Sequence, residues 1–403
     1  GMVSGSSVGN TVTTGSVTIP MMKKTGYPGE FAGAVEAAAS TGGQIMPPIM
    51  GAAAFIMAEM TGFEYSKIIV RAILPAFLYF LGIFLGVHFK AKKLGLKGLP
   101  REELPKWGKL LPKIYLLLPL VLLVYMIVSG QTMAKSAIYA TIAAIAVSLI
   151  NKDDRMTPTK FVNGLENGGK NCISIGIACG IAGIISVCIT MTGLGGKLIT
   201  YVVSLSNGHL IIALFLTMIC CIVLGMGVPT TANYIIMAST CAPILINGMG
   251  MHVLAANMFV FYFGIVADIT PPVALAAYAG SAIAKAPPMK TAFNATRLAI
   301  AAFIIPYIFA FNNAMIFVGD DVTVWSVASI TISATLGMLS IAAGLMGYLI
   351  HDLKWISRIA LLAGGLLMII PGTVSDLAGF AVLAAIFILQ TIENKKEKKA
   401  ASV

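Results

Sequence analysis

The sequence predicts an all-α polytopic membrane protein of about ten membrane-spanning helices, two re-entrant hairpins and two broken helices, arranged as inverted-topology repeats. Three observations support this prediction. Of the 403 residues, 58% are hydrophobic and 11% are charged, whereas soluble domains carry about 45–50% apolar and about 25% charged residues. Many apolar stretches are long enough to cross a bilayer. Glycine and proline interrupt them at four places, which match in two pairs.

The formal charge of +11 comes from basic residues that cluster in a few segments between apolar stretches. The positive-inside rule explains such clusters, because lysine-rich segments stay on the cytoplasmic side of the membrane. We therefore expect no nucleic-acid binding. The six cysteines lie in apolar segments without metal-binding spacing, and the sequence shows no Ser/His/Asp set and no phosphate-cradling loop. We expect a protein that is not an enzyme and that carries no cofactor.

The first element is the tip and return arm of a re-entrant hairpin, predicted over residues 1–22. Its tip carries Gly5 and Asn10, and the lysine pair at residues 23–24 places its end on the cytoplasmic side. Only four residues precede Gly5. We therefore expect the first arm of this hairpin to belong to a longer protein.

A broken helix follows over residues 28–58. It is interrupted at residues 42–48, which end in a double proline, and prolines stop the helical ladder because they lack N–H groups. Residues 68–87 form an apolar span that returns to the cytoplasmic side. The lysine-rich residues 90–113 then form a cytoplasmic linker.

The middle of the chain is predicted to form a pair of spans, a cytoplasmic surface segment, one further span and a helix along the outer face. These elements occupy residues 114–128, 134–150, 151–170, 172–191 and 194–207. A second hairpin follows, with one arm at residues 210–224, a tip at 225–233 and a return arm at 234–245. A crossing needs about 20 residues, so the short return arm favours a re-entrant segment.

The second broken helix covers residues 253–284 and is interrupted at residues 268–272. It leads inward to a basic segment. The chain then crosses outward to the acidic pair at residues 320–321 and ends with additional helices and a basic cytoplasmic tail after residue 394. The apolar stretches of this last part are residues 298–318, 324–350, 359–370 and 377–392.

The four interruptions form an internal repeat. At the hairpin tips the corresponding residues are 223 positions apart, and at the broken helices they are 224 apart. Matched interruptions in two halves are a sequence signature of a secondary transporter's binding site. The corresponding residues are Asn10 and Asn233, Pro20 and Pro243, Gln44 and Asp268, Pro47 and Pro271, and Pro48 and Pro272.

The repeat divides the chain into three parts. Residues 1–150 form the first repeat, residues 151–320 the second, and residues 321–403 the additional C-terminal helices and tail. Because the basic clusters direct the first broken helix outward and the second inward, we expect the two repeats to have opposite topology.

The interruptions are also the predicted substrate and ion site, because polar groups and broken backbone at membrane depth are costly unless they line a site. Unwound carbonyls, hydroxyls, amides and carboxylates are hard oxygen ligands that suit sodium. The predicted site residues are Ser6, Ser7, Asn10, Thr11, Thr41, Gly42, Gln44, Pro47 and Pro48 in the first repeat, and Gly225, Gly227, Thr230, Thr231, Asn233, Asp268, Thr270, Pro271 and Pro272 in the second. The sodium-ligand candidates are Ser6, Asn10, Thr231, Asn233 and Asp268.

Two carboxylates lie within these apolar elements. No lysine or arginine occurs between Lys197 and Lys285, so Asp268 has no basic partner nearby in sequence. We expect Asp268 to lie near an ion or to orient its ligands, with a paired structural charge as the alternative. Glu36 precedes the first break, where helix-packing and ion-access roles are both open.

These motifs, in this order, resemble the large membrane subunit of tripartite ATP-independent periplasmic (TRAP) transporters over about residues 1–310. Residues 13–21, 24–28 and 36–48 are most similar to the fused permeases that work with TAXI-type binding proteins. The resemblance implies a sodium-coupled elevator-type importer in the inner membrane of a prokaryote. It also implies a periplasmic solute-binding protein that delivers a small carboxylate substrate, and a small membrane subunit or a scaffold fused upstream.

Other functions remain open from the sequence. The nearest is a sodium/dicarboxylate-type carrier that needs no binding protein. Another alternative is a non-transporting scaffold subunit, and this hypothesis predicts that the polar breaks tolerate apolar substitution. An intramembrane enzyme is disfavoured because the sequence lacks a catalytic set.

Overall fold

The computed structural model describes residues 5–98, 100, 102, 107–150, 155–319, 322–369 and 372–400, and most of these residues are helical. No strand forms in these residues, and an isolated antiparallel bridge joins Tyr348 to Asp352. The predicted all-α class is confirmed. The acidic pair expected at residues 320–321 and the first residues of the segment expected at 151–170 lie outside the described residues.

The first repeat begins with the expected hairpin arm and broken helix. The Ser6 side chain caps α1 (Ser7–Thr25) by accepting from the Gly9 N–H, and Gly26 ends the helix with φ 110°. The broken helix consists of α2 (Gly29–Gly42) and α3 (Ala52–Thr61), with the double proline in the non-helical segment between them.

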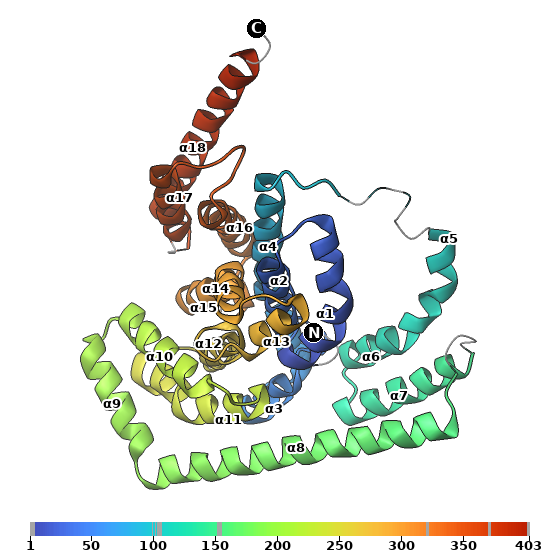
Figure 1. Ribbon diagram of the computed structural model, residues 1–403. Helices are drawn as coiled ribbons and strands as arrows, with labels where there is room; N and C mark the ends of the chain where they lie inside the picture. The colour runs from blue at the N-terminus through green and yellow to red at the C-terminus, as the bar shows by residue number, and fades with distance from the viewer. Residues whose placement is uncertain are drawn as a thin grey trace.

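The following helices surround this unit. The 29-residue α4 (Tyr65–Lys93) continues into the lysines that were expected to belong to the linker. Helices α6 and α7 pack on each other, and α8 runs along one edge of the molecule to α9 (Figure 1). The elements are α5 (Trp107–Leu110), η2 (Leu111–Leu117), α6 (Leu118–Val128), α7 (Met133–Ile150), α8 (Pro158–Met191) and α9 (Leu194–Ser206).

The second repeat reproduces the hairpin and the broken helix. Its return arm starts at Thr230, so Thr230, Thr231 and Asn233 lie in the first helical turn rather than in the non-helical tip that we expected. Pro229 is the N-cap residue of α11, so the helix begins at the next residue. The elements are α10 (Leu210–Gly225), α11 (Thr230–Thr240), η3 (Ile244–Gly248), α12 (Val253–Val266), η4 (Ala267–Ile269) and α13 (Leu275–Ala284).

The last helices are α14 (Pro288–Leu298), α15 (Ile300–Phe311), η5 (Asn313–Ile316), α16 (Val324–Met346), α17 (Trp355–Leu367) and α18 (Thr373–Ala400). The basic tail expected after residue 394 is not a separate segment, because α18 continues through it. Lysine, glutamate and alanine are good helix formers, so the helix propagates into this stretch.

Six helices of the described residues are long and apolar enough to cross a membrane, or seven if the bent pair Cys179–Ile189 and Leu194–Ser206 is one span. The hairpin arms and the halves of the broken helices are shorter, between 10 and 17 residues where they are apolar. A span that is broken in the middle is therefore not counted among the long helices. The number of about ten crossings therefore stays a prediction.

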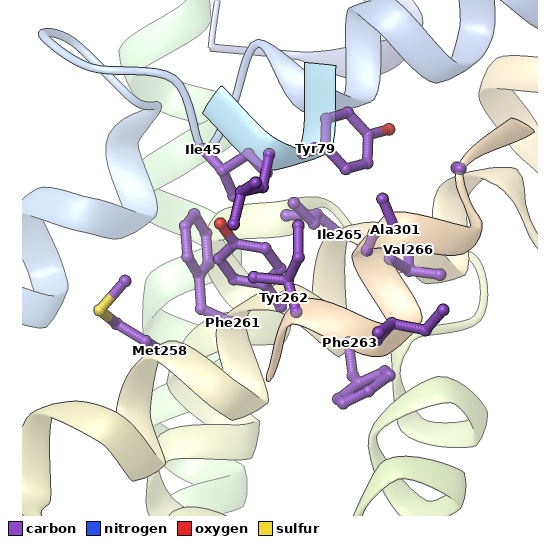
Figure 2. Packing of buried hydrophobic residues seen from close by; sticks show 14 of the residues in the cluster. Ile45, Tyr79, Met258, Phe261, Tyr262, Phe263, Ile265, Val266 and Ala301 are labelled. Atoms are coloured by element: carbon purple, nitrogen blue, oxygen red, sulfur yellow. The ribbon is translucent and has the colours of Figure 1, made fainter. Parts of the chain in front are cut away.

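Helix α12 is the centre of the core. Every residue from Leu254 to Val266 is buried. Figure 2 shows Phe261, Tyr262 and Ile265 of this helix packed below Ile45 and Tyr79 from the first part of the chain. The second repeat therefore supplies the apolar surface against which the first break closes.

Two glycines bring the broken helices into backbone contact. A Cβ at Gly33 in α2 would lie 2.9 Å from the Gly280 carbonyl oxygen, and one at Gly280 in α13 would lie 2.6 Å from the Gly33 oxygen. Small residues allow such close approach between membrane helices. The two repeats are thus joined directly, backbone to backbone.

Gly42 provides a test of this packing. A Cβ there would lie 2.1 Å from Tyr79 Cε1, and the buried Tyr79 ring is held by its hydroxyl, which donates to the Ala38 carbonyl at 2.7 Å. We expect Gly42→Ala to destabilise the protein by about 3 kcal/mol through overpacking. The measurement is thermal unfolding in detergent, with Gly176→Ala as the control because a Cβ there meets nothing within 4 Å. Equal melting temperatures for the two variants would contradict the packing described here.

Candidate functional site

Each hairpin tip lies against the end of the break in its own repeat. Gly5, with φ 64°, would place a Cβ 3.2 Å from Gly51 Cα, and Gly227, with φ 76°, would place one 3.9 Å from a Val273 side-chain carbon. By the repeat offsets Gly5 corresponds to Val228 and Gly51 to Leu275, so the two contacts lie in similar places without being equivalent residue for residue. Both glycines take a left-handed backbone conformation that favours glycine. Each tip therefore turns at a glycine near the end of its break, and the closer approach to backbone is at Gly5.

The two tip asparagines make equivalent contacts. Asn10 Nδ2 donates to Ser40 Oγ at 2.8 Å, and Asn233 Nδ2 donates to the Gly264 carbonyl at 3.0 Å. Gly264 follows Ser40 by 224 positions, the offset of the broken helices. Each asparagine thus ties the return arm of its hairpin to the first half of its own broken helix.

Two side-chain hydrogen bonds that join described residues cross between the repeats, one from Lys23 to the Ala284 carbonyl and one, at the breaks, from Ser7 to Asp268. Ser7 Oγ donates to Asp268 Oδ2 at 2.5 Å, and both side chains are buried. This short distance is typical of a hydroxyl that donates to an ionised carboxylate. No salt bridge to Asp268 is found among the described residues. The partner that the sequence could not identify is therefore a hydroxyl from α1, 261 residues away.

The equivalent pair in the other half behaves differently. Counting by the repeat offsets, Thr230 corresponds to Ser7 and Gln44 corresponds to Asp268. Gln44 is 1% exposed, and neither its Oε1 nor its Nε2 has a hydrogen-bond partner among the described residues. The site therefore holds a carboxylate with a partner on one side and an amide without one on the other.

Buried polar atoms without partners gather at these breaks. Leaving such an atom unpaired costs about 1–3 kcal/mol, so a ligand, an ion or ordered water is expected to complete its hydrogen bonding. Asn233 Oδ1 is a hard oxygen of the kind that sodium prefers. Besides the two Gln44 amide atoms, the side-chain atoms here that lack a partner within the described part of the chain are Thr41 Oγ1, Asn233 Oδ1 and Tyr262 Oη.

Tyr262 was missed by the sequence analysis. It lies in the apolar α12, where a tyrosine is indistinguishable from a core aromatic residue by pattern alone. Figure 2 shows its hydroxyl directed toward the loop that carries Ile45. The only sequence signal would have been its polar tip, since buried tyrosine hydroxyls usually find a partner.

Other predicted residues have local structural contacts. The Thr11 hydroxyl donates to the Ser7 carbonyl, and the Thr270 hydroxyl donates to the Val266 carbonyl. Ser6 is exposed and caps α1. Thr230 and Thr231 are half-buried and have no side-chain hydrogen bond to a described residue. The structure thus gives these five residues different environments rather than one shared ligand sphere.

The glycine and proline positions shape the breaks. A Cβ at Gly225 would lie 2.7 Å from Asn233 Nδ2 and 2.9 Å from Ala267 Cβ, so only glycine lets the asparagine reach its place. Both double prolines, Pro47–Pro48 and Pro271–Pro272, contain a cis peptide bond. The second pair therefore repeats the first in backbone conformation as well as in sequence.

Glu36 lies at the centre of a hydroxyl cluster between α1 and α2. It is buried and accepts hydrogen bonds from Thr14, from Thr18 Oγ1 at 2.5 Å and from Ser40 Oγ at 3.2 Å. Ser40 in turn accepts from Asn10, so the cluster continues to the hairpin tip. The corresponding residues of the second repeat are Met237, Cys241, Val260 and Gly264, which cannot reproduce it.

This cluster provides a stability test. Hydrogen bonds to a charged group contribute about 1.5–3 kcal/mol each, so the double variant Thr14→Val/Thr18→Val should lower the melting temperature clearly. Thr13→Val is the matched control, since Thr13 is exposed on the same helix and donates only to the Gly9 carbonyl.

Adding Glu36→Leu to the double variant should restore part of the stability, because no carboxylate is then left without donors. Double and triple variants of equal stability would show that the hydroxyls do not hold Glu36.

Comparisons with known proteins are consistent with one family. A family model described as the tripartite ATP-independent periplasmic transporter, DctM component, matches residues 1–322. The chain is 26% identical over 294 residues to the uncharacterized protein y4mL of Sinorhizobium fredii, covering 71% of this chain and 68% of that protein. It is 24% identical over 291 residues to the C4-dicarboxylate TRAP transporter large permease protein DctM of Pseudomonas aeruginosa, covering 71% and 66%. The chain thus matches about two thirds of the length of each relative.

Proposed function

The chain belongs to the DctM family of large membrane components of tripartite ATP-independent periplasmic transporters, and from this premise we propose a specific role for it. It is a multi-pass permease of the inner membrane. We propose that it couples the entry of sodium to the import of a small organic acid. A periplasmic solute-binding protein delivers this substrate.

The hydrogen bond between Ser7 and Asp268 is the observation that carries this proposal. It joins the return arm of the first hairpin to the break of the second repeat, at 2.5 Å and away from solvent. A cation or a substrate group that competes for Asp268 changes the contact between the two repeats. Binding at the breaks then alters how the hairpin-bearing unit is held, as alternating access requires.

Sodium fits the donor set of the second break. Asn233 Oδ1 is buried and has no hydrogen-bond partner among the described residues, while Nδ2 of the same side chain donates to the Gly264 carbonyl. Asp268 supplies negative charge next to freed backbone. Of the predicted ligands, we assign Asn233 and Asp268 to sodium. Asn10 holds the equivalent position at the first break.

The substrate carboxylate is proposed to lie where the second halves of the broken helices begin. Helix α3 starts at Ala52 and α13 at Leu275, and unpaired N–H groups at such ends favour negative charge. The Pseudomonas aeruginosa relative is named for C4-dicarboxylates. For this chain we propose the wider class of small organic acids.

The tripartite family supplies the proposed partners. They are a solute-binding protein, which we propose to be of the TAXI type, and a small membrane subunit or a scaffold fused upstream. In this proposal, residues 1–150 and 151–320 are the two inverted repeats, and they move relative to this scaffold. Residues 321–403 are additional helices.

Uptake into proteoliposomes tests the function. The full-length protein is reconstituted with its membrane partner, and uptake of candidate organic acids is measured with and without a sodium gradient. The same assay is repeated with and without the binding protein. Uptake that needs both sodium and the binding protein is expected. Uptake without a binding protein would instead indicate a dicarboxylate-type carrier.

Asp268→Asn tests the ion site. The substitution keeps the shape of the side chain and removes its charge, so we expect the half-saturating sodium concentration to rise on the order of tenfold, or ~1.4 kcal/mol. Gln44→Glu at the equivalent position is the matched comparison and should change this concentration less. Size-exclusion chromatography first confirms that both variants fold. An unchanged sodium dependence in Asp268→Asn would remove Asp268 from the coupling site.

A further inference from the structure

Four cationic side chains gather where α4, α14, α16 and α17 meet. The meeting point is defined by Gly86, since a Cβ there would lie 2.9 Å from Leu298 Cδ2 and 3.6 Å from Met346 Cε. Basic residues flank this point on three helices. They are Lys90 and Lys93 at the end of α4, Arg297 at the end of α14 and Arg358 in α17.

Two of the four cations bind the end of α16. Arg358 donates to the Gly344 carbonyl at 2.9 Å and to the Leu345 carbonyl at 3.1 Å. Lys93 Nζ lies 3.5 Å from the carbonyl oxygens of Met346 and Gly347. A Cβ at Gly347 would lie 3.1 Å from Arg358 Nε and 3.3 Å from Lys93 Nζ. The cations are therefore close neighbours, although each has helix carbonyls as partners.

The other two cations lack such partners. Lys90 Nζ lies 5.7 Å from the centroid of the Phe31 ring, where the charges of Arg297 and Lys93 repel it and Glu30 attracts it. Arg297 is half-buried and makes no hydrogen bond or ion pair with any described residue. Arg358 repels it in turn. A half-buried guanidinium without an anion is costly.

Acidic residues do not balance this group. Asp352 forms an ion pair with Lys93 at 3.2 Å, although its side chain is 72% exposed. The charge of Glu30 attracts Lys90. Four cations thus face two carboxylates. The excess positive charge lies on the side where basic segments place the cytoplasm.

Exposed apolar side chains adjoin the cations. Phe293, one turn before Arg297 on α14, is 62% exposed. Trp355, against which Arg358 stacks at 5.0 Å, is 68% exposed, and Ile356 is 81% exposed. Tryptophan is typical of the level of the lipid headgroups. The cations therefore lie at the border between an apolar surface and an aqueous one.

We propose that this group of residues binds the phosphate of an anionic phospholipid in the cytoplasmic leaflet, with Arg297 and Lys90 as its principal ligands. A guanidinium binds phosphate oxygens with two parallel hydrogen bonds. The acyl chains lie along the exposed apolar side chains of α14 and α17. A soluble phosphate satisfies the charges but leaves this apolar surface uncovered, so the lipid is the better match. Basic pockets between membrane helices on the cytoplasmic side recognise such headgroups.

Lipid titration tests this proposal without any transport assay, so its outcome is independent of the proposed function. Full-length protein, delipidated in neutral detergent, is titrated with phosphatidylglycerol, with phosphatidylcholine and with inorganic phosphate, and the melting temperature is followed. Phosphatidylglycerol should raise the melting temperature, and the two other additions should not. In Arg297→Gln the half-saturating phosphatidylglycerol concentration should rise about fivefold, the equivalent of about 1 kcal/mol per cation.

Lys290→Gln is the matched control, because it removes one charge from an exposed position at the other end of α14. It should titrate like the unmodified protein. Lys90→Gln replaces Arg297→Gln if the latter fails to fold. Equal responses to phosphatidylglycerol and phosphatidylcholine, or a normal response in these variants, would overturn the proposal. Stabilisation by inorganic phosphate alone would show that the ligand is a soluble anion and not a lipid.

Discussion

The bilayer offers no water to unpaired polar groups, and this constraint governs where the chain can leave helical structure. Each break must be enclosed by other parts of the protein. Glycines make this possible, because Gly42 admits the Tyr79 ring and Gly225 admits the Asn233 amide. The contact between Gly33 and Gly280 brings the two broken helices together at their backbones. Close packing around the breaks is thus a condition for having a polar site at this depth.

The two repeats share their architecture but differ in chemistry. The tip asparagines make matching contacts, and both double prolines contain a cis peptide bond. Asp268, a carboxylate with a partner, corresponds in the repeat to Gln44, an amide that has none among the described residues. The hydroxyl cluster of Glu36 corresponds to residues that are apolar or small. The two breaks therefore differ in polarity although their backbones are built alike. In the proposed function, the charged break binds the ion and the neutral break is completed by a neutral ligand or water.

The helices beyond the matched region are fastened to the core by a defined contact. Helix α16 packs along α4, and Lys93 and Arg358 neutralise its C-terminal carbonyls. These contacts hold the C-terminal helices on the same side of α4 as Arg297. Residues 323–403 lie outside the family match, yet they complete the basic group at the end of α4. They therefore add to the membrane-facing surface rather than to the breaks.

The sequence by itself determined the all-α membrane class, the positions of the four breaks and the pairing of the two repeats, because hydropathy and the backbone effects of glycine and proline are local properties. It also identified Asp268 as the exceptional carboxylate. Some helix ends differ from the prediction: α11 begins inside the expected tip, and α18 continues through the expected tail. Only the tertiary structure decided that Ser7 is the partner of Asp268 and that Gln44 has no partner among the described residues. It also placed Tyr262 and the Glu36 cluster beside the breaks. Such contacts join residues far apart in sequence, and they depend on how the helices pack rather than on any local pattern.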